Sequence, residues 1–292
     1  MRFATKLAVG SAVLLVVVKT AAYFQTHSVA LLSSLVDSVL DILASAVNMI
    51  AVRHALTPAD AQHRFGHGKA EPLSGLTQAA FVAGSAVLVI VEAASRFGDR
   101  TPVTDGPLGI AVMLFSIAVT ILLVMFQRYV VKRTGSLAIT ADSLHYSGDV
   151  LLNVSVIVAL VLATRLNIAW ADAAFGIGIA LFLLVNAIRI ANASVSALMD
   201  HELPEADRRM IIETARRHPK VRGVHELRTR SSGVQQFIQM HIVLDKTLTL
   251  IEAHRISDEV EAAVQSDFPA ADVIIHQDPE GVAEYHQPVG AP

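Results

Sequence analysis

Two apolar stretches of the sequence each contain a pair of possible metal ligands four positions apart. The segment SLVDSVLD includes Asp37 and Asp41, and the segment ADSLHYSGD includes His145 and Asp149. Residues at this spacing lie on one face of a helix, about 6 Å apart. Two facing helices could therefore surround one cation with three carboxylates and one imidazole. That ligand set suits Zn²⁺ and its divalent neighbours, whereas the imidazole disfavours Mg²⁺ and Ca²⁺ and the lack of sulfur disfavours Cu⁺.

Both pairs lie deep in stretches that are long enough to cross a lipid bilayer. At about 1.5 Å of rise per residue, Asp41 is roughly 18 Å from the outer end of its helix and Asp149 roughly 18 Å from the inner end of its own. In a hydrocarbon core about 30 Å thick, both are near the middle. A carboxylate there costs at least about 2.5–3.5 kcal/mol on insertion scales, so these side chains must face each other or water. The alternative is a buried polar cluster that only joins two helices.

The same ligand set suggests an energy source. Metal ligands must be deprotonated to bind. A histidine, with an unperturbed pKa of about 6.5, can therefore exchange a proton for a metal ion around neutral pH. Taking up protons from one side and metal from the other would make the protein an antiporter. No nucleotide is expected, because GHGKAE has neither the spacing of a Walker A sequence nor the hydroxyl residue after its lysine.

Two further clusters of possible metal ligands lie outside the apolar stretches. The connection DAQHRFGHGKAE contains Asp60, His63 and His67, spaced like ligands of a second site, although histidines in loops are usually only solvated. Near the end of the chain is a third cluster, in which alternation along a strand would place His241 away from the apolar core. Its members are His225, His241, His254, His276 and Asp278.

The composition divides the chain into two parts. Of its 292 residues, 53% are hydrophobic and 17% are charged, against about 45–50% and about 25% in soluble domains. Residues 1–200 contain 13 Lys or Arg and 11 Asp or Glu, whereas the shorter segment 201–292 contains 10 and 15. We predict a transmembrane domain over 1–200 and a soluble domain over 201–292. The net charge of −3 argues against a nucleic-acid partner, and the absence of cysteine excludes disulfides and thiolate ligands.

Six stretches are long and apolar enough to cross a bilayer as helices, namely 7–24, 29–55, 73–94, 108–126, 137–162 and 168–191. With the N-terminus inside, nine Lys or Arg fall in inner connections and only Arg96, Arg100 and Arg165 in outer ones. The positive-inside rule then places both termini, and the soluble domain, in the cytoplasm. Lys19 is only about 8 Å of helix from the outer end of the first span, so we expect it to extend to the interface rather than act in transport.

The sequence of the soluble part predicts a small α+β fold. Its pattern favours a helix over 204–218, strands at 224–229 and 235–244, a helix over 250–268 and a short strand at 272–276. The turn sequence Ser231 to Gly233 separates the first two strands. From Gln277 onward, proline, glycine and polar residues predict an irregular end.

Six motifs spread over nearly the whole chain resemble those of the cation diffusion facilitator family, and specifically its bacterial zinc and ferrous-iron efflux members. In order they are SLVDSVLD, HRFGHGKAE, ADSLHYSGD, LMDHELP, HELRTRSSG and DVIIHQDP. The resemblance implies a homodimer in the bacterial inner membrane, with a cytoplasmic domain of metallochaperone-like fold. It also implies that Asp37, Asp41, His145 and Asp149 form the transport site and that Asp60, His63 and His67 form a loop site.

The resemblance further implies that the third cluster is a cytoplasmic binuclear site in which Asp278 bridges two ions. It implies a charge pair between Lys69 and Asp200 at the dimer junction. We therefore expect a six-span antiporter that exports Zn²⁺, or Fe²⁺, Cd²⁺ or Co²⁺, in exchange for protons by alternating access, with metal also as a regulatory ligand. The alternative is a membrane-anchored metal sensor or scaffold that transports nothing. An enzyme is not expected, because the sequence has no protease or nucleotide-binding motif.

Overall fold

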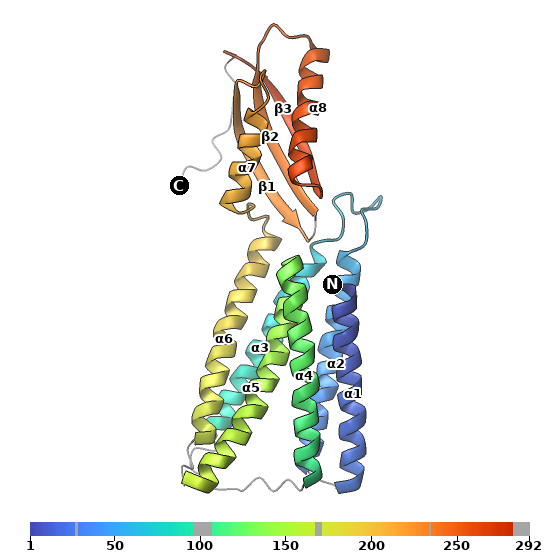
Figure 1. Cartoon of the computed structure of the whole chain (residues 1–292), viewed down its shortest axis with the longest axis vertical. Helices are drawn as coiled ribbons and strands as arrows, with labels where there is room; N and C mark the ends of the chain where they lie inside the picture. Colours follow the sequence, from blue (N-terminus) through green and yellow to red (C-terminus); the bar gives the residue numbers. More distant parts are fainter. Residues whose placement is uncertain (27–28, 96–106, 167–170, 234, 283–292) are drawn as a thin grey trace. The chain divides into compact units, whose positions relative to one another are not determined.

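The computed structural model describes residues 1–26, 29–95, 107–166, 171–233 and 235–282 (Figure 1). The chain separates into two compact units, Met1–Leu198 and Met199–Pro292. The start of the expected sixth span, at 168–170, lies outside the described residues. So do Arg96 and Arg100, two of the three arginines assigned to the outer side.

The first unit is a bundle of six helices (Figure 1). They are α1 (Arg2–Thr26), α2 (Val29–Ala55), α3 (Ala70–Ser95), α4 (Pro107–Thr134), α5 (Leu137–Leu166) and α6 (Ala171–Leu198). Within the described residues, α1, α2, α3, α4 and α6 each contain a segment long and apolar enough to cross a membrane. Helix α5 is 30 residues long and contains the ADSLHYSGD motif in its first half.

Small residues line the contacts between these helices. Helix α3 packs mainly against α6, α1 mainly against α2, and α5 contacts α3, α4 and α6. Ala86 of α3 and Ala180 of α6 are completely buried. A Cβ atom on Gly148 of α5 would lie 2.9 Å from the Cδ1 atom of Leu183, so the glycine permits a close approach to α6. Large apolar side chains such as Leu88 and Leu122 are about 70% and 68% exposed, as expected where lipid is the solvent.

The second unit is a three-stranded sheet with two helices. Its elements are α7 (Glu205–Arg216), β1 (Gly223–Ser232), β2 (Gln235–Leu244), α8 (Leu250–Asp267) and β3 (Ala271–Pro279). The strand order is β1-β2-β3, with β1 antiparallel and β3 parallel to β2. Ile211 of α7 and Ile256 and Val260 of α8 pack with Ile238 and Met240 of β2, so both helices cover one face of the sheet.

The other face of this sheet contains a row of histidines. Pairing places His225 of β1 opposite His241 of β2, and His241 opposite His276 of β3. The expectation that His241 points away from the apolar core is confirmed, because its neighbours Met240 and Ile242 belong to that core. The face opposite the helices thus presents one imidazole from each strand.

The soluble unit differs from the predicted pattern at its last strand. The prediction of an irregular end from Gln277 was wrong, because β3 continues to Pro279, paired with Leu244 of β2. Gln277 also donates a side-chain hydrogen bond of 2.7 Å to the Ser257 hydroxyl of α8. Parallel pairing with β2 and this hydrogen bond keep the polar end of β3 extended, although its composition had predicted an irregular segment.

Candidate metal centres

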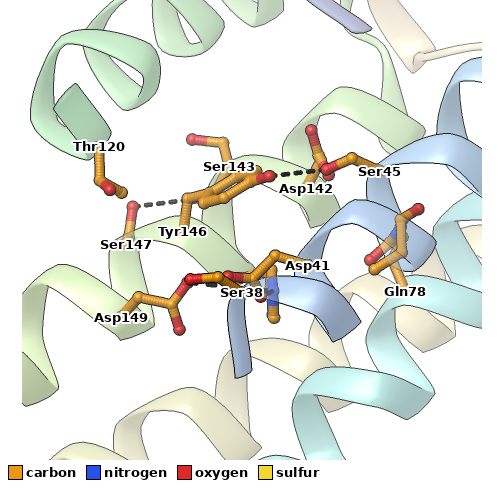
Figure 2. A network of polar contacts seen from close by, with 12 residues as sticks. Ser38, Asp41, Ser45, Gln78, Thr120, Asp142, Ser143, Tyr146, Ser147 and Asp149 are labelled. Atoms are coloured by element: carbon orange, nitrogen blue, oxygen red, sulfur yellow. Dashed lines mark hydrogen bonds and ion pairs between the residues drawn. The ribbon is translucent and has the colours of Figure 1, made fainter. Parts of the chain in front are cut away.

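Three of the four predicted transport-site residues meet inside the helical unit. His145 Nε2 lies 2.9 Å from Asp41 Oδ1 and 3.9 Å from Asp149 Oδ2. One ligand atom from each of these residues lies within 4.8 Å of the other two, and all three side chains are partly buried. Figure 2 shows Asp41 and Asp149 facing each other across the space between α2 and α5. Two oxygens and one nitrogen at this spacing can bind one divalent cation.

The fourth predicted ligand, Asp37, lies one helical turn before Asp41 and is exposed. It is not among the three residues whose ligand atoms lie together. The i,i+4 spacing puts both carboxylates on one face of α2, but they are offset along the helix axis by about 6 Å. Within the described geometry, Asp37 is therefore a neighbour of the three-residue cluster rather than a member.

The prediction that Lys19 of α1 extends to the outer interface was wrong. Its ammonium donates hydrogen bonds to the Ser38 hydroxyl at 2.7 Å and to the Ser34 carbonyl oxygen at 3.1 Å, both on α2. Ser38 lies between Asp37 and Asp41 in the sequence. The expectation failed because helical depth alone ignores the acceptors on a neighbouring helix, which satisfy an ammonium as well as interfacial water does.

A buried polar network lies next to this cluster (Figure 2). The Tyr146 and Ser45 hydroxyls are hydrogen-bonded at 2.7 Å. Asp142 is 1% exposed and accepts a 2.6 Å hydrogen bond from Gln127 Nε2. Sequence reasoning missed Asp142, although its position in the predicted fifth span, three residues before His145, was a usable signal. Burying a carboxylate is costly unless hydrogen bonds compensate it, and here the Gln127 amide supplies one such bond.

The predicted loop residues also come together. His63 Nδ1 and His67 Nε2 each lie 3.4 Å from a carboxylate oxygen of Asp60. The backbone N–H groups of His63 and Gln62 donate to Asp60 Oδ1 at 2.7 and 2.9 Å, and the bond from His63 is the main reason why the pKa of this exposed carboxyl is lowered. The rings of His54 and His67 are in contact, with centroids 4.6 Å apart. His54, at the end of α2, is a neighbour that the loop motif did not include.

The clearest cluster of the soluble unit surrounds Asp278, whose side chain is only 4% exposed. His241 Nδ1 lies 2.9 Å and His225 Nε2 3.0 Å from Asp278 Oδ2. His276 Nε2 lies 3.2 Å from the other oxygen, Asp278 Oδ1. Because the two carboxylate oxygens face different imidazoles, the side chain has the geometry that bridging two ions would need. This cluster lies on the sheet face opposite the helices.

The fifth predicted residue of this cluster lies elsewhere in the chain. His254 is on α8, where its Nε2 atom is 3.5 Å from Asp258 Oδ2, and its side chain is 70% exposed. Helix α8 covers the opposite face of the sheet, so a single chain does not bring His254 to Asp278. Its assignment as a ligand stays a prediction.

Glu226 is a neighbour of the cluster that the sequence did not reveal. Its Oε2 atom is 3.6 Å from His241 Nε2, the ring nitrogen on the far side from Asp278. The register of β1 and β2 shifts between His225 and Arg228, and Glu226 within this irregularity has a φ of 47°. A non-glycine residue in the left-handed region is strained, and such strain is common at functional sites. A cavity of about 250 Å³ opens beside Glu226, His241 and His276.

The two members of the predicted charge pair belong to different units. In the first unit, the Lys69 ammonium donates to the carbonyl oxygens of Ala197 and Leu198 at the end of α6. In the second, Asp200 lies 3.4 Å from Arg230 and has a φ of 57°. The pairing of Lys69 with Asp200 stays a prediction.

Comparisons with known proteins match both units. The family described as the cation efflux transmembrane domain matches residues 5–199, and the cation efflux protein cytoplasmic domain matches residues 203–280. The cation-efflux pump FieF of Pectobacterium atrosepticum is 45% identical over 276 residues, which are 94% of this chain and 92% of that protein. FieF of Escherichia coli O1:K1 / APEC is 44% identical over 274 residues, covering 93% and 90%.

Solved structures also match part of the chain. The Zn form of CzrB is 32% identical, covers 30% of this chain and 99% of its own, and has a TM-score of 0.28. A variant of MamM-CTD in its cadmium form is 34% identical, covers 26% and 95%, and has a TM-score of 0.25. The assignment therefore depends on the sequence matches. Because these cover nearly the whole chain, the chain belongs to the cation diffusion facilitator family of cation-efflux membrane proteins.

Proposed function

We propose that the protein is a proton-coupled antiporter that exports divalent transition-metal ions from the cytoplasm, with Zn²⁺ as the first candidate and Fe²⁺, Cd²⁺ and Co²⁺ as the others. The observation that supports this most directly is the meeting of Asp41, His145 and Asp149 between two membrane helices. Family membership supports metal efflux, and the mixed oxygen and nitrogen ligands favour this group of metals. We also propose Asp37, one helical turn before Asp41 on α2, as a fourth ligand of the transport site, which it would have to approach from outside the three-residue cluster.

The proton coupling is proposed from the chemistry of the ligands. The shared atom of the cluster is His145 Nε2, which contacts both Asp41 and Asp149. A ring nitrogen that binds a metal cannot hold a proton at the same time. Binding of metal and of protons at this nitrogen is therefore mutually exclusive, and exchange follows if each is taken up from a different side of the membrane.

We assign supporting roles to the other two clusters. Asp60, His63 and His67 form a proposed cytoplasm-facing loop site, and the cluster around Asp278 forms a proposed regulatory site. The match to the family's cytoplasmic domain supports a homodimer with cytoplasmic termini in the bacterial inner membrane. Metal bound in the soluble domains would draw the two copies together and shift the population of transport states.

Transport into proteoliposomes under an imposed pH gradient tests this function. The wild-type protein should move Zn²⁺ at a rate that follows the proton gradient, and D41A and D149A should each abolish this flux while the protein remains folded. The variant D207A, which removes a carboxylate from α7 in the soluble unit, should retain wild-type flux. Metal movement that ignores the gradient would refute antiport. Unchanged flux in D41A and D149A would place transport elsewhere and favour a metal sensor or scaffold.

A further inference from the structure

Lys19 of α1 is a positive charge beside the proposed transport site. Its ammonium is held on α2 by the Ser38 hydroxyl at 2.7 Å and the Ser34 carbonyl oxygen at 3.1 Å. Ser38 directly follows Asp37 and comes three residues before Asp41, so the ammonium lies on the face of α2 that contributes Asp41 to the cluster. Lys19 is therefore a cation from α1 that is held on α2 within one helical turn of Asp41.

The charges of the site explain what such an ammonium can do. Asp41 and Asp149 lie between α2 and α5, and Asp37 is exposed one helical turn from Asp41, so three carboxylates together place three negative charges at or beside the site. When metal is bound, the histidine must be deprotonated and adds no charge. Buried charges of one sign are costly unless they are compensated. Lys19 reduces the excess to two negative charges, which one divalent cation can neutralise. Asp142 lies three residues before His145 on α5, where it is bonded to Gln127, and substitutions of Lys19, Ser38 or Lys6 leave it unchanged.

We propose that Lys19 is a tethered cation of the transport site. Its ammonium offsets one carboxylate when the metal is absent and repels the metal when it is bound, so that the site binds a divalent ion weakly enough to release it. This inference rests on the proposed transport function, because it assumes that the metal enters the cluster of Asp41, His145 and Asp149. It adds a residue on a third helix, α1, that sets affinity without acting as a ligand.

The competing explanation is purely structural, because the two hydrogen bonds of Lys19 also tie α1 to α2. Removing a structural tie should loosen the site and weaken metal binding. Removing a repelling charge should strengthen it. The two explanations therefore predict opposite signs for the same substitution. At an effective dielectric constant of about 20, nearby unit charges interact strongly enough to change a binding constant by more than tenfold.

Four variants of the full-length protein separate charge from hydrogen bonding. K19M removes the charge and the bonds, and K19R keeps the charge. S38A removes a hydrogen bond but leaves the ammonium. K6M removes a lysine from the exposed surface of α1, far along the helix from the cluster, and is the control. Zn²⁺ binding is measured by calorimetry, with D41A as the baseline that leaves the loop and soluble-domain sites intact.

The Zn²⁺ binding that is lost in D41A is the binding at the transport site. Its affinity should rise about tenfold or more in K19M and stay close to that of the wild type in K19R, S38A and K6M. In the flux assay, K19M should lower both the apparent KM and the maximal rate, because a tighter site releases metal slowly. Unchanged or weaker binding in K19M, or an S38A variant that behaves like K19M, would overturn the role of Lys19. Flux that ignores the proton gradient would refute antiport alone, because the calorimetric comparison does not depend on it.

Discussion

Replacing Asp278 by asparagine should remove the metal dependence of the soluble domain's stability. The side chain is 4% exposed and lies within about 3 Å of nitrogen atoms of His225, His241 and His276. Asparagine has nearly the same shape but has neither the negative charge nor the second ligand oxygen that a bridging role needs. The three imidazoles remain, but they lose the group that brings them together.

The size of the effect follows from mass action. A ligand that binds only the folded state stabilises it by about 2.7 kcal/mol when its free concentration is about 100 times its dissociation constant. Amides that exchange only when the site opens should then exchange about 100-fold more slowly. We expect this slowing in the peptides that cover β2 and β3, because these strands contain three of the four residues of the cluster.

Hydrogen exchange followed by mass spectrometry on the full-length protein measures this, with and without Zn²⁺. The matched control is D272N, which makes the same chemical change on the same strand, about 20 Å from Asp278 along β3. Asp272 is exposed. We expect D272N to keep the Zn²⁺-dependent protection and D278N to lose it. Equal protection in both variants would refute the assignment of Asp278 as the central ligand.

Four further predictions concern single contacts. T249A removes the hydroxyl that accepts a hydrogen bond from the backbone N–H of Glu252 at the start of α8, but keeps the bond from the backbone N–H of residue 249 to the Glu252 carboxylate. The substitution should cost about 1 kcal/mol of helix stability, measured by urea denaturation. The backbone N–H of Thr249 lowers the pKa of Glu252, so the contribution of this bond is present above the ordinary carboxyl pKa. Thermal denaturation between pH 7 and 3 should show it being lost as the pH falls through the lowered value. Y146F removes the hydroxyl that is hydrogen-bonded to the buried Ser45 hydroxyl and should cost about 1 kcal/mol in a thermal denaturation of the protein in detergent. E226Q weakens the contact that orients the neighbouring imidazole and should lower the Zn²⁺ affinity of the soluble domain about 10- to 100-fold by calorimetry.

The face on which a residue lies could be predicted from the sequence wherever helix or strand periodicity determines it. The spacing of Asp41, His145 and Asp149 identified which faces of α2 and α5 meet, because i,i+4 pairs share a face whatever the helices pack against. Alternation in β2 likewise identified the exposed face of His241. Both predictions depend only on local geometry, which the sequence determines directly.

Contacts between elements were not predictable in the same way. The hydrogen bond between Lys19 and Ser38 depends on how α1 packs against α2, and the pairing of the buried Asp142 with Gln127 depends on how α4 packs against α5. His254 shares the residue type of the Asp278 cluster, but helix α8 packs on the other side of the sheet. Glu226 reaches His241 only because a bulge shifts the register of β1. Each case requires knowledge of tertiary packing that no spacing rule contains.

The packing of the bundle gives the proposed transport cycle a physical basis. Helix α2 packs mainly against α1, whereas α5 packs mainly against α3, α4 and α6, so the two helices of the site share little direct interface. Two of the polar contacts between them are His145 with Asp41 and Tyr146 with Ser45. A metal ion bound by Asp41 and Asp149 would cross-link α2 to α5, and protonation of the ligands would release that cross-link. Since helices with a small apolar interface can separate at low cost, exchanging metal for protons at this position can change the relation of α2 to α5, as alternating access requires.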